Sequence, residues 1–397
     1  MSRHELLRVI ASSADAMIDF AARLIAIPTE NPPGTAYGPC VKALAAELDR
    51  LGLAPEVVPI PGEPETCCLR AFHGRGPRTL YFHGHYDVIP AADPAQFRPE
   101  RHRGNLFGRG SADMKAGLAA MIYAVKAIKD CRLDLHGRLG LLLVPDEETG
   151  GARGSQPLAM AGILGEDGIG MLTPEPSGGV IWNASRGALS LRVTVKGKAA
   201  HVGMHFQGVN AFDGMHDVVA RLRELRREVQ TRSTSFRIAP DAARRSILLL
   251  GGVCSGGTNF NVVPDRVSFT VDRRTNPDED FDEEKARLFA CLEEAARSGL
   301  ELKTEILQEG RAAGFSEDEP LVQALARSVQ SVTGHLPRVE LCPGLLEIHY
   351  YAQKNVPALA YGPGRLSVAH GPREFVPIKD VKDCAAIYAL TAADLLA

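Results

Sequence analysis

Five short segments of this sequence combine histidine or acidic residues with glycine or proline in a way that could build a metal site. The segments are His83 to Asp87, Gly108 to Gly117, Pro145 to Gly151, Thr173 to Pro176 and Tyr361 to Pro372. Imidazole nitrogens and carboxylate oxygens are the ligands that catalytic zinc and similar ions use. Bound ions of this kind can activate water. Hydrolysis assisted by metal ions is therefore the chemistry that these residue types could support.

The first segment places His83, His85 and Asp87 at alternate positions. This spacing lets an imidazole reach a metal ion while the nearby carboxylate fixes its ring and raises its basicity. Taken alone, the segment is more typical of a turn with a solvated His–Asp pair.

The second segment begins like a dinucleotide-binding fingerprint, but Asp113 stands where the third glycine should be. The sequence has no Walker pattern either, so a phosphate cradle is not indicated. Asp113 could cap the following helix, which is the commoner use of such an aspartate. Its two carboxylate oxygens could also bridge two cations, and the local sequence does not decide between these roles.

Asp146, Glu147 and Glu148 follow the apolar run Leu139–Val144, which is typical of a strand buried on both faces. Three adjacent carboxylates at a buried strand end repel one another, so they are costly unless cations neutralise them. One glutamate could bind a metal while its neighbour takes a proton from water. A solvated acidic loop is the alternative, and the apolar run leading into the cluster makes it the weaker one.

The last two segments carry single candidates, Glu175 between two prolines and His370 in a loop framed by glycine and proline. Proline stiffens the backbone around Glu175, which suits a ligand but also suits an ordinary loop. A lone histidine in such a loop is more often incidental. No single segment is decisive, and the case depends on their order along the chain.

The elements that would position these residues alternate between helix and strand. Helical spacing marks Asp15–Leu24, Cys40–Leu51, Lys115–Lys129 and Leu321–Val332, and strand patterns mark Thr79–His83, Leu139–Val144 and Ala358–Tyr361. This alternation predicts an α/β domain, a mixed sheet flanked by helices. In open sheets of this class, ligands bind at the carboxyl ends of the strands, where these segments fall.

Between these parts the order changes to strand, helix, strand, strand, helix, strand. The segments are Ala188–Val195, Val209–Glu228, Ser246–Val253, Arg266–Asp272, Glu279–Arg297 and Leu302–Leu307. This is the order of a ferredoxin-like α+β domain. We therefore expect a catalytic domain over residues 1–185 and 310–397, with an inserted domain over residues 186–309. Two domains also fit a length of 397 residues.

Composition limits the kinds of partner. The formal net charge is −3 and no basic block is present, which argues against a nucleic-acid or membrane-surface role. No apolar run approaches the length of a membrane span, and the N-terminus does not resemble a signal peptide. The eight cysteines include no Cys-x-x-Cys pair, so reduced thiols in the cytoplasm are expected.

Taken in order, the segments resemble the co-catalytic zinc amidohydrolases and peptidases that include acetylornithine deacetylase, succinyl-diaminopimelate desuccinylase, aminoacylase and carboxypeptidase G. The resemblance spans Thr79 to Val376. It implies a binuclear metallo-amidohydrolase with two divalent ions, zinc foremost and cobalt or manganese as alternatives. The implied metal ligands are His85, Asp113, Glu148, Glu175 and His370, with Asp113 bridging and His85 and Glu175 on opposite metals. Asp87 would orient His85, and Glu147 would be the general base.

The inserted domain would then be a lid and dimerisation domain. Gly197 to Gly203 resembles the segment of the family's lid histidine, so His201 is expected to reach the active site of a second subunit and polarise the scissile carbonyl. Substrate contacts are expected at Asn261, Arg274, His349 and Gly344. These expectations imply a homodimer that acts on a small molecule.

The sequence departs from the family pattern near the expected substrate pocket. Glu347-Ile348-His349 replaces a common Asp-Ala-Arg, Arg373 stands where relatives carry Asn or Asp, and His205 stands where proline is frequent. Loss of the family arginine puts a standard carboxylate pocket in doubt.

The first hypothesis for the reaction is hydrolysis of the C–N bond of a small N-acyl amino acid or related amide. Dipeptidase or carboxypeptidase activity and aryl-amine deamination are alternatives on the same scaffold. A catalytically inactive binding protein is the alternative of another class, but all six implied metal and base residues are present.

Overall fold

The computed structural model describes residues 3–296 and 301–397, which fall into two compact units. The first unit consists of Met1–Asn183, Phe315–Glu340 and Glu347–Ala397, and the second of Ala184–Gly314 and Leu341–Leu346. Each unit has an apolar core of its own. Within the described residues, no helix combines the length and apolar character that crossing a membrane requires.

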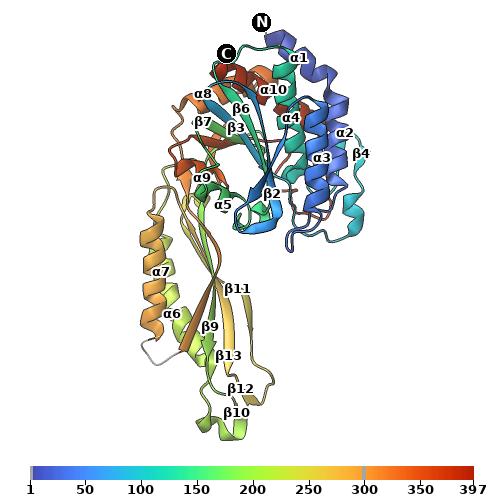
Figure 1. Cartoon of the computed structure of the whole chain (residues 1–397). Helices are drawn as coiled ribbons and strands as arrows, with labels where there is room; N and C mark the ends of the chain where they lie inside the picture. The colour runs from blue at the N-terminus through green and yellow to red at the C-terminus, as the bar shows by residue number, and fades with distance from the viewer. Residues whose placement is uncertain (1–2, 297–300) are drawn as a thin grey trace. The chain divides into compact units, whose positions relative to one another are not determined.

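A mixed sheet forms the centre of the first unit (Figure 1). In spatial order its strands are β1 (Glu56–Ile60), β2 (Glu63–Gly74), β6 (Arg138–Val144), β3 (Thr79–His85), β7 (Gly168–Thr173), β17 (Ala358–Ala360) and β8 (Ile181–Ser185). Strand β3 runs parallel to both β6 and β7, and β17 runs parallel to β7. The outer strands β1, β2 and β8 pair antiparallel with their neighbours. The predicted mixed sheet is confirmed.

Helices cover both faces of this sheet, as β3 shows residue by residue. Phe82 packs edge-on against Tyr388 of helix α10 (Ile378–Leu396), with ring centroids 4.8 Å apart. Its neighbour Tyr81 points to the opposite face and contacts Tyr351 of helix α9 (Ile348–Ala352) at 5.8 Å. Successive side chains of a strand alternate between faces. A strand covered on both sides is therefore mostly apolar, which explains the continuous apolar run Leu139–Val144 in β6.

The remaining helices of the first unit pack around this core. They are α1 (Arg3–Ser12), α2 (Ala14–Ile25), α3 (Tyr37–Arg50), α4 (Ala116–Asp130), α5 (Ser155–Met160) and α8 (Pro320–Thr333). Three short strands, β4 (Glu100–His102), β5 (Asn105–Phe107) and β18 (Phe375–Pro377), form a separate antiparallel sheet. The four helices predicted from apolar spacing correspond to α2, α3, α4 and α8.

The second unit has the predicted ferredoxin-like topology. Its antiparallel strands lie in the order β11 (Ile247–Gly256), β13 (Arg266–Thr275), β9 (Gly187–Lys196) and β14 (Glu301–Gly310). Helices α6 (Ala211–Val229) and α7 (Phe281–Ala296) contact each other and pack on one face of this sheet (Figure 1). Helix α7 begins at Phe281 rather than at the predicted Glu279, because the Asp280 side chain accepts hydrogen bonds from the backbone N–H groups of Asp282 and Glu283. The predicted end of that helix, Arg297, lies outside the described residues.

Candidate metal centre

The candidate ligands follow parallel strands that end at one edge of the first unit's sheet. Strand β3 ends at His85, which pairs with Val144 at the end of β6. The acidic loop begins two residues after Val144, and Glu175 lies two residues after the end of β7. Parallel neighbours bring their carboxyl ends together, so the three segments converge as expected.

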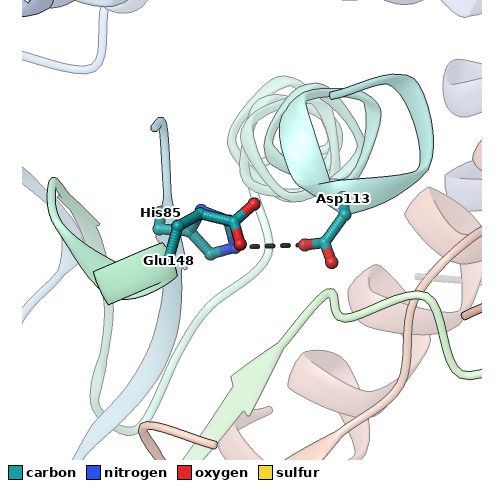
Figure 2. A group of neighbouring side chains, drawn as sticks. All are labelled: His85, Asp113 and Glu148. Carbon is teal, nitrogen blue, oxygen red and sulfur yellow. Dashed lines mark hydrogen bonds and ion pairs between the residues drawn. The ribbon is translucent and has the colours of Figure 1, made fainter. Parts of the chain in front are cut away.

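Three predicted ligands, His85, Glu148 and His370, lie around a fourth, Asp113. Figure 2 shows His85, Asp113 and Glu148. His85 Nε2 lies 3.1 Å from Asp113 Oδ1. His370 Nε2 lies 3.4 Å from Asp113 Oδ2 and 3.1 Å from Glu148 Oε2. The two oxygens of Asp113 therefore face different histidines. The alternative role of Asp113 as a helix cap is wrong, because helix α4 begins after Lys115 and has no side-chain cap.

Two observations fit this group to divalent metal ions. One ligand atom each from His85, Asp113 and Glu148 lies within 4.8 Å of the other two. Glu148 Oε1 is buried and has no hydrogen-bond partner among the described residues. A buried carboxylate oxygen without a partner is costly, and a cation would satisfy it. Imidazole and carboxylate donors together are a ligand set that zinc, cobalt and manganese accept.

Glu147 and Glu175 complete the acidic surroundings. Glu147 Oε2 lies 3.8 Å from His85 Nε2, and its side chain is 19% exposed, against 5% for Glu148. Glu147 therefore reaches the centre but is more accessible than its neighbour, as a proton acceptor must be. Glu175, two residues after β7, is buried, and it interacts electrostatically with Asp113, His85 and Glu148.

The buried carboxylates of the centre favour positive charge beside them. Burial raises the pKa values of Glu147 and Glu175 well above their ordinary range, and neighbouring carboxylates raise them further. Burial disfavours a charged His85, but hydrogen bonds to Asp113 and Asp87 raise its pKa well above the ordinary value. Hydrogen bonds to Asp113 and Glu148 raise the pKa of His370 to about 10. The carboxylates thus favour positive charge on the groups between them.

Asp87 holds both the histidine and the acidic loop. His85 Nδ1 lies 3.1 Å from the Asp87 carbonyl oxygen and 3.4 Å from its Oδ1. The Asp87 carboxylate also accepts hydrogen bonds from the backbone N–H groups of Glu147 and Glu148, at 3.3 and 3.2 Å. Its position supports the predicted orienting role, and the contact with the acidic loop adds a second one.

The third carboxylate of the acidic cluster, Asp146, is buried and does not point to the metal ligands. It accepts hydrogen bonds from the Arg153 backbone, the Thr149 hydroxyl and the Asn31 side chain. The alternative of a solvated acidic loop is therefore wrong, because its first carboxylate is a buried hub of the loop.

Sequence reasoning missed two supporting residues. Asn31 Nδ2 lies 2.9 Å from Asp87 Oδ2 and 3.0 Å from Asp146 Oδ1, so it ties the two loops together. Glu374 pairs with the buried Arg109 and accepts hydrogen bonds from the backbone N–H groups of Ala112 and Asp113. It thereby fixes the turn that presents Asp113. Neither residue has a local sequence pattern that would have revealed it.

Four other predicted site residues belong to the second unit, whereas the metal ligands belong to the first. His201 is exposed on the short strand β10 (Ala200–His201), and its Nδ1 accepts a hydrogen bond from the Gly203 backbone. Arg274 pairs with Asp272 at 3.0 Å. Asn261 and Gly344 lie in loops. Their roles toward substrate stay predictions.

His349, the remaining predicted substrate contact, belongs to the first unit. It is buried in α9 and stacks on Tyr350, with ring centroids 3.9 Å apart.

Comparison with known proteins gives a consistent picture. A model of peptidase family M20/M25/M40 matches residues 81–394. A probable succinyl-diaminopimelate desuccinylase from Staphylococcus epidermidis is 27% identical, and the alignment covers 90% of this chain and 92% of that protein.

Solved structures share the fold. An M20 family metallo-carboxypeptidase from Sulfolobus solfataricus superposes with a TM-score of 0.79 at 17% identity, covering 96% of this chain and 99% of that one. The dipeptidase Dug1p from Saccharomyces cerevisiae superposes with a TM-score of 0.77 at 18% identity, covering 99% and 98%.

Proposed function

Because the chain belongs to peptidase family M20/M25/M40 and is therefore a metal-dependent hydrolase, we propose that it cleaves the C–N amide bond of a small N-acyl amino acid or a related compound. The observation that carries this proposal is the convergence of His85, His370 and Glu148 on Asp113. Glu147 lies next to this group, is partly accessible and is not one of the proposed metal ligands.

The proposed centre holds two divalent ions, with zinc as the expected metal and cobalt or manganese as alternatives. His370 Nε2 lies 3.1 Å from Glu148 Oε2, so these two residues would bind one ion, and His85 and Glu175 would bind the other rather than opposite ions as the sequence led us to expect. Asp113 would bridge the two ions. The contact of each Asp113 oxygen with a different histidine supports this division. Two such ions lower the pKa of water and polarise the oxygen of a scissile carbonyl.

Glu147 is the proposed general base. Its carboxylate would take a proton from the attacking water and deliver that proton to the nitrogen of the leaving amine. Burial raises its pKa well above the ordinary range, which favours a group that must both accept and release a proton near neutral pH. Asp87 keeps Glu147 in place through its hydrogen bond to the Glu147 backbone.

The second unit is the proposed lid and the proposed surface for a homodimer. Strand β11 is an edge strand of its sheet, and Leu249 and Val253 on it are 52% and 63% exposed. An exposed apolar edge is a natural place for pairing with a second chain. In such a dimer His201 would serve the active site of the partner subunit, as the resemblance to the family implies.

Paired substitutions test the assigned base against the assigned ligands. Glu147→Gln is expected to retain bound metal and lower kcat by about 10²- to 10⁴-fold, because only the proton acceptor is removed. Glu148→Gln is expected to lose metal as well as activity. Metal content by atomic emission and steady-state kinetics on N-acyl amino acids distinguish the two. An active Glu147→Gln enzyme would remove the assigned base, and full activity in chelator-treated protein would contradict the metal-dependent mechanism.

A further inference from the structure

Glu347 has a buried carboxylate oxygen that the proposed chemistry does not use. The residue precedes helix α9, and its side chain is 9% exposed. Its Oε2 lies 2.6 Å from His83 Nε2, but Oε1 has no hydrogen-bond partner among the described residues. Leaving one oxygen of a buried carboxylate without a donor is costly. The cost is removed if a ligand supplies that donor.

Gly151 lies beside this oxygen. A β-carbon on Gly151 would lie only 3.0 Å from Glu347 Oε1 and 3.3 Å from the Tyr350 hydroxyl oxygen. Gly151 also has a φ of +72°, which favours glycine. The β-carbon of any larger residue at position 151 would therefore face two oxygens, one anionic and one phenolic. A hydrogen-bond donor placed there would face the same two oxygens.

The carboxylates near Glu347 also carry negative charge. Glu347 lies close enough to Glu147 and Glu175 for its charge to act on both. No lysine or arginine of the described chain lies within ion-pair distance of Glu347, and His83 is its one basic contact. Since Glu347 is not among the proposed metal ligands, the proposed metal ions do not use its charge.

We propose that Glu347 determines specificity by accepting a hydrogen bond from an ammonium group of the substrate. The substrate class would be small amides that carry a free amine, such as aminoacyl amino acids. The same negative charge would disfavour an acyl group that ends in a carboxylate, such as succinyl. This inference rests on the proposed function, because it assumes amide hydrolysis at the neighbouring metal centre.

Matched substrates test the proposal in the metal-loaded wild-type enzyme. Glycyl and acetyl amides of one amino acid differ only by the ammonium group that the glycyl compound carries on its acyl side. N-acetyl-lysine, acylated at its α-nitrogen, and N-acetyl-norleucine make the same comparison on the amine side. In one of the pairs the ammonium compound is expected to have a kcat/KM higher by about tenfold to a hundredfold, mainly through KM. A succinyl amide is expected to be the poorest substrate.

Equal kcat/KM values within both pairs would overturn the role of Glu347 while leaving amide hydrolysis intact. Hydrolysis of none of these compounds would instead refute the proposed function. Calorimetric binding of the same pairs to metal-loaded Glu147→Gln protein then tests the ammonium preference without turnover, so the two failures can be told apart.

Substitution of Glu347 locates the preference. Glu347→Gln keeps the shape and the contact with His83 but removes the charge, so the preference for the ammonium compound is expected to fall to about twofold or less. The acetyl compound should be affected little, whereas a merely structural role would lower both alike. Glu340→Gln, at a partly buried glutamate paired with Arg338, is the matched control and should keep the wild-type preference. An unchanged preference in Glu347→Gln would contradict the proposal, and if that variant does not fold, the wild-type pairs still decide.

Discussion

Lys115 follows Asp113 by two residues and is fully buried, without an ion pair among the described residues. Its ammonium group donates to the Ile27 carbonyl oxygen at 2.6 Å. Burial lowers its pKa to about 8, from an ordinary value of 10.5. Between these two values the unfolded chain binds more protons than the folded one, so stability rises with pH. Below about pH 8 the ammonium group is charged in both the folded and the unfolded chain, so the free-energy cost of burying the charge is present in full. Urea unfolding of metal-free protein at pH 8 and 9.5 should show this group contributing up to about 1.4 kcal/mol per pH unit.

Other groups titrate over the same pH range, so the pH dependence of unfolding is compared between the wild type and Lys115→Met. The variant should lack this increment and show a flatter dependence on pH than the wild type. Lys198→Met, at an exposed lysine in the second unit, should keep the wild-type dependence. Identical pH slopes for all three proteins would mean that Lys115 is not the titrating group.

At the scale of elements, the spacing of apolar residues along the sequence predicted individual strands and helices. The apolar run Leu139–Val144 became β6, and the spacing in Lys115–Lys129 became α4. Because parallel strands end at one edge, the convergence of the ligand segments followed. The supporting residues could not be predicted in this way. Asn31 is 56 positions from Asp87, and Glu374 is 261 positions from Asp113, so only the folded chain brings each pair together.

Helix α4, which follows Asp113, packs closely against the loop after β7, which carries Glu175. A β-carbon at Gly117 would lie 2.6 Å from Pro174 Cβ and 2.9 Å from the Pro174 carbonyl oxygen, next to Glu175. Gly117→Ala is therefore expected to move this loop, lower the free energy of unfolding by about 1–3 kcal/mol and weaken metal binding. Chemical denaturation and titration of metal into the apoprotein measure both effects.

Gly38 in helix α3 is the matched control, because a β-carbon there would meet nothing within 4 Å. Gly38→Ala should raise the free energy of unfolding by up to about 1 kcal/mol, since alanine is the better helix former, with metal affinity unchanged. The same substitution in two helices thus has opposite expected signs. A Gly117→Ala protein as stable as Gly38→Ala would show that the contact with Pro174 is not tight.

At the scale of the whole molecule, the proposed dimer makes a prediction that no single chain can satisfy. His201→Ala and Glu147→Ala proteins should each be nearly inactive alone. When they are unfolded together and refolded, one site of each mixed dimer combines an intact Glu147 with an intact His201 from the partner subunit. Random pairing makes half of the dimers mixed, so about a quarter of wild-type activity should return. Leu249→Lys on the exposed β11 edge should lower both the mass measured by light scattering and this recovery. A mixture that stays inactive although light scattering shows dimers would mean that His201 does not act across the subunit interface.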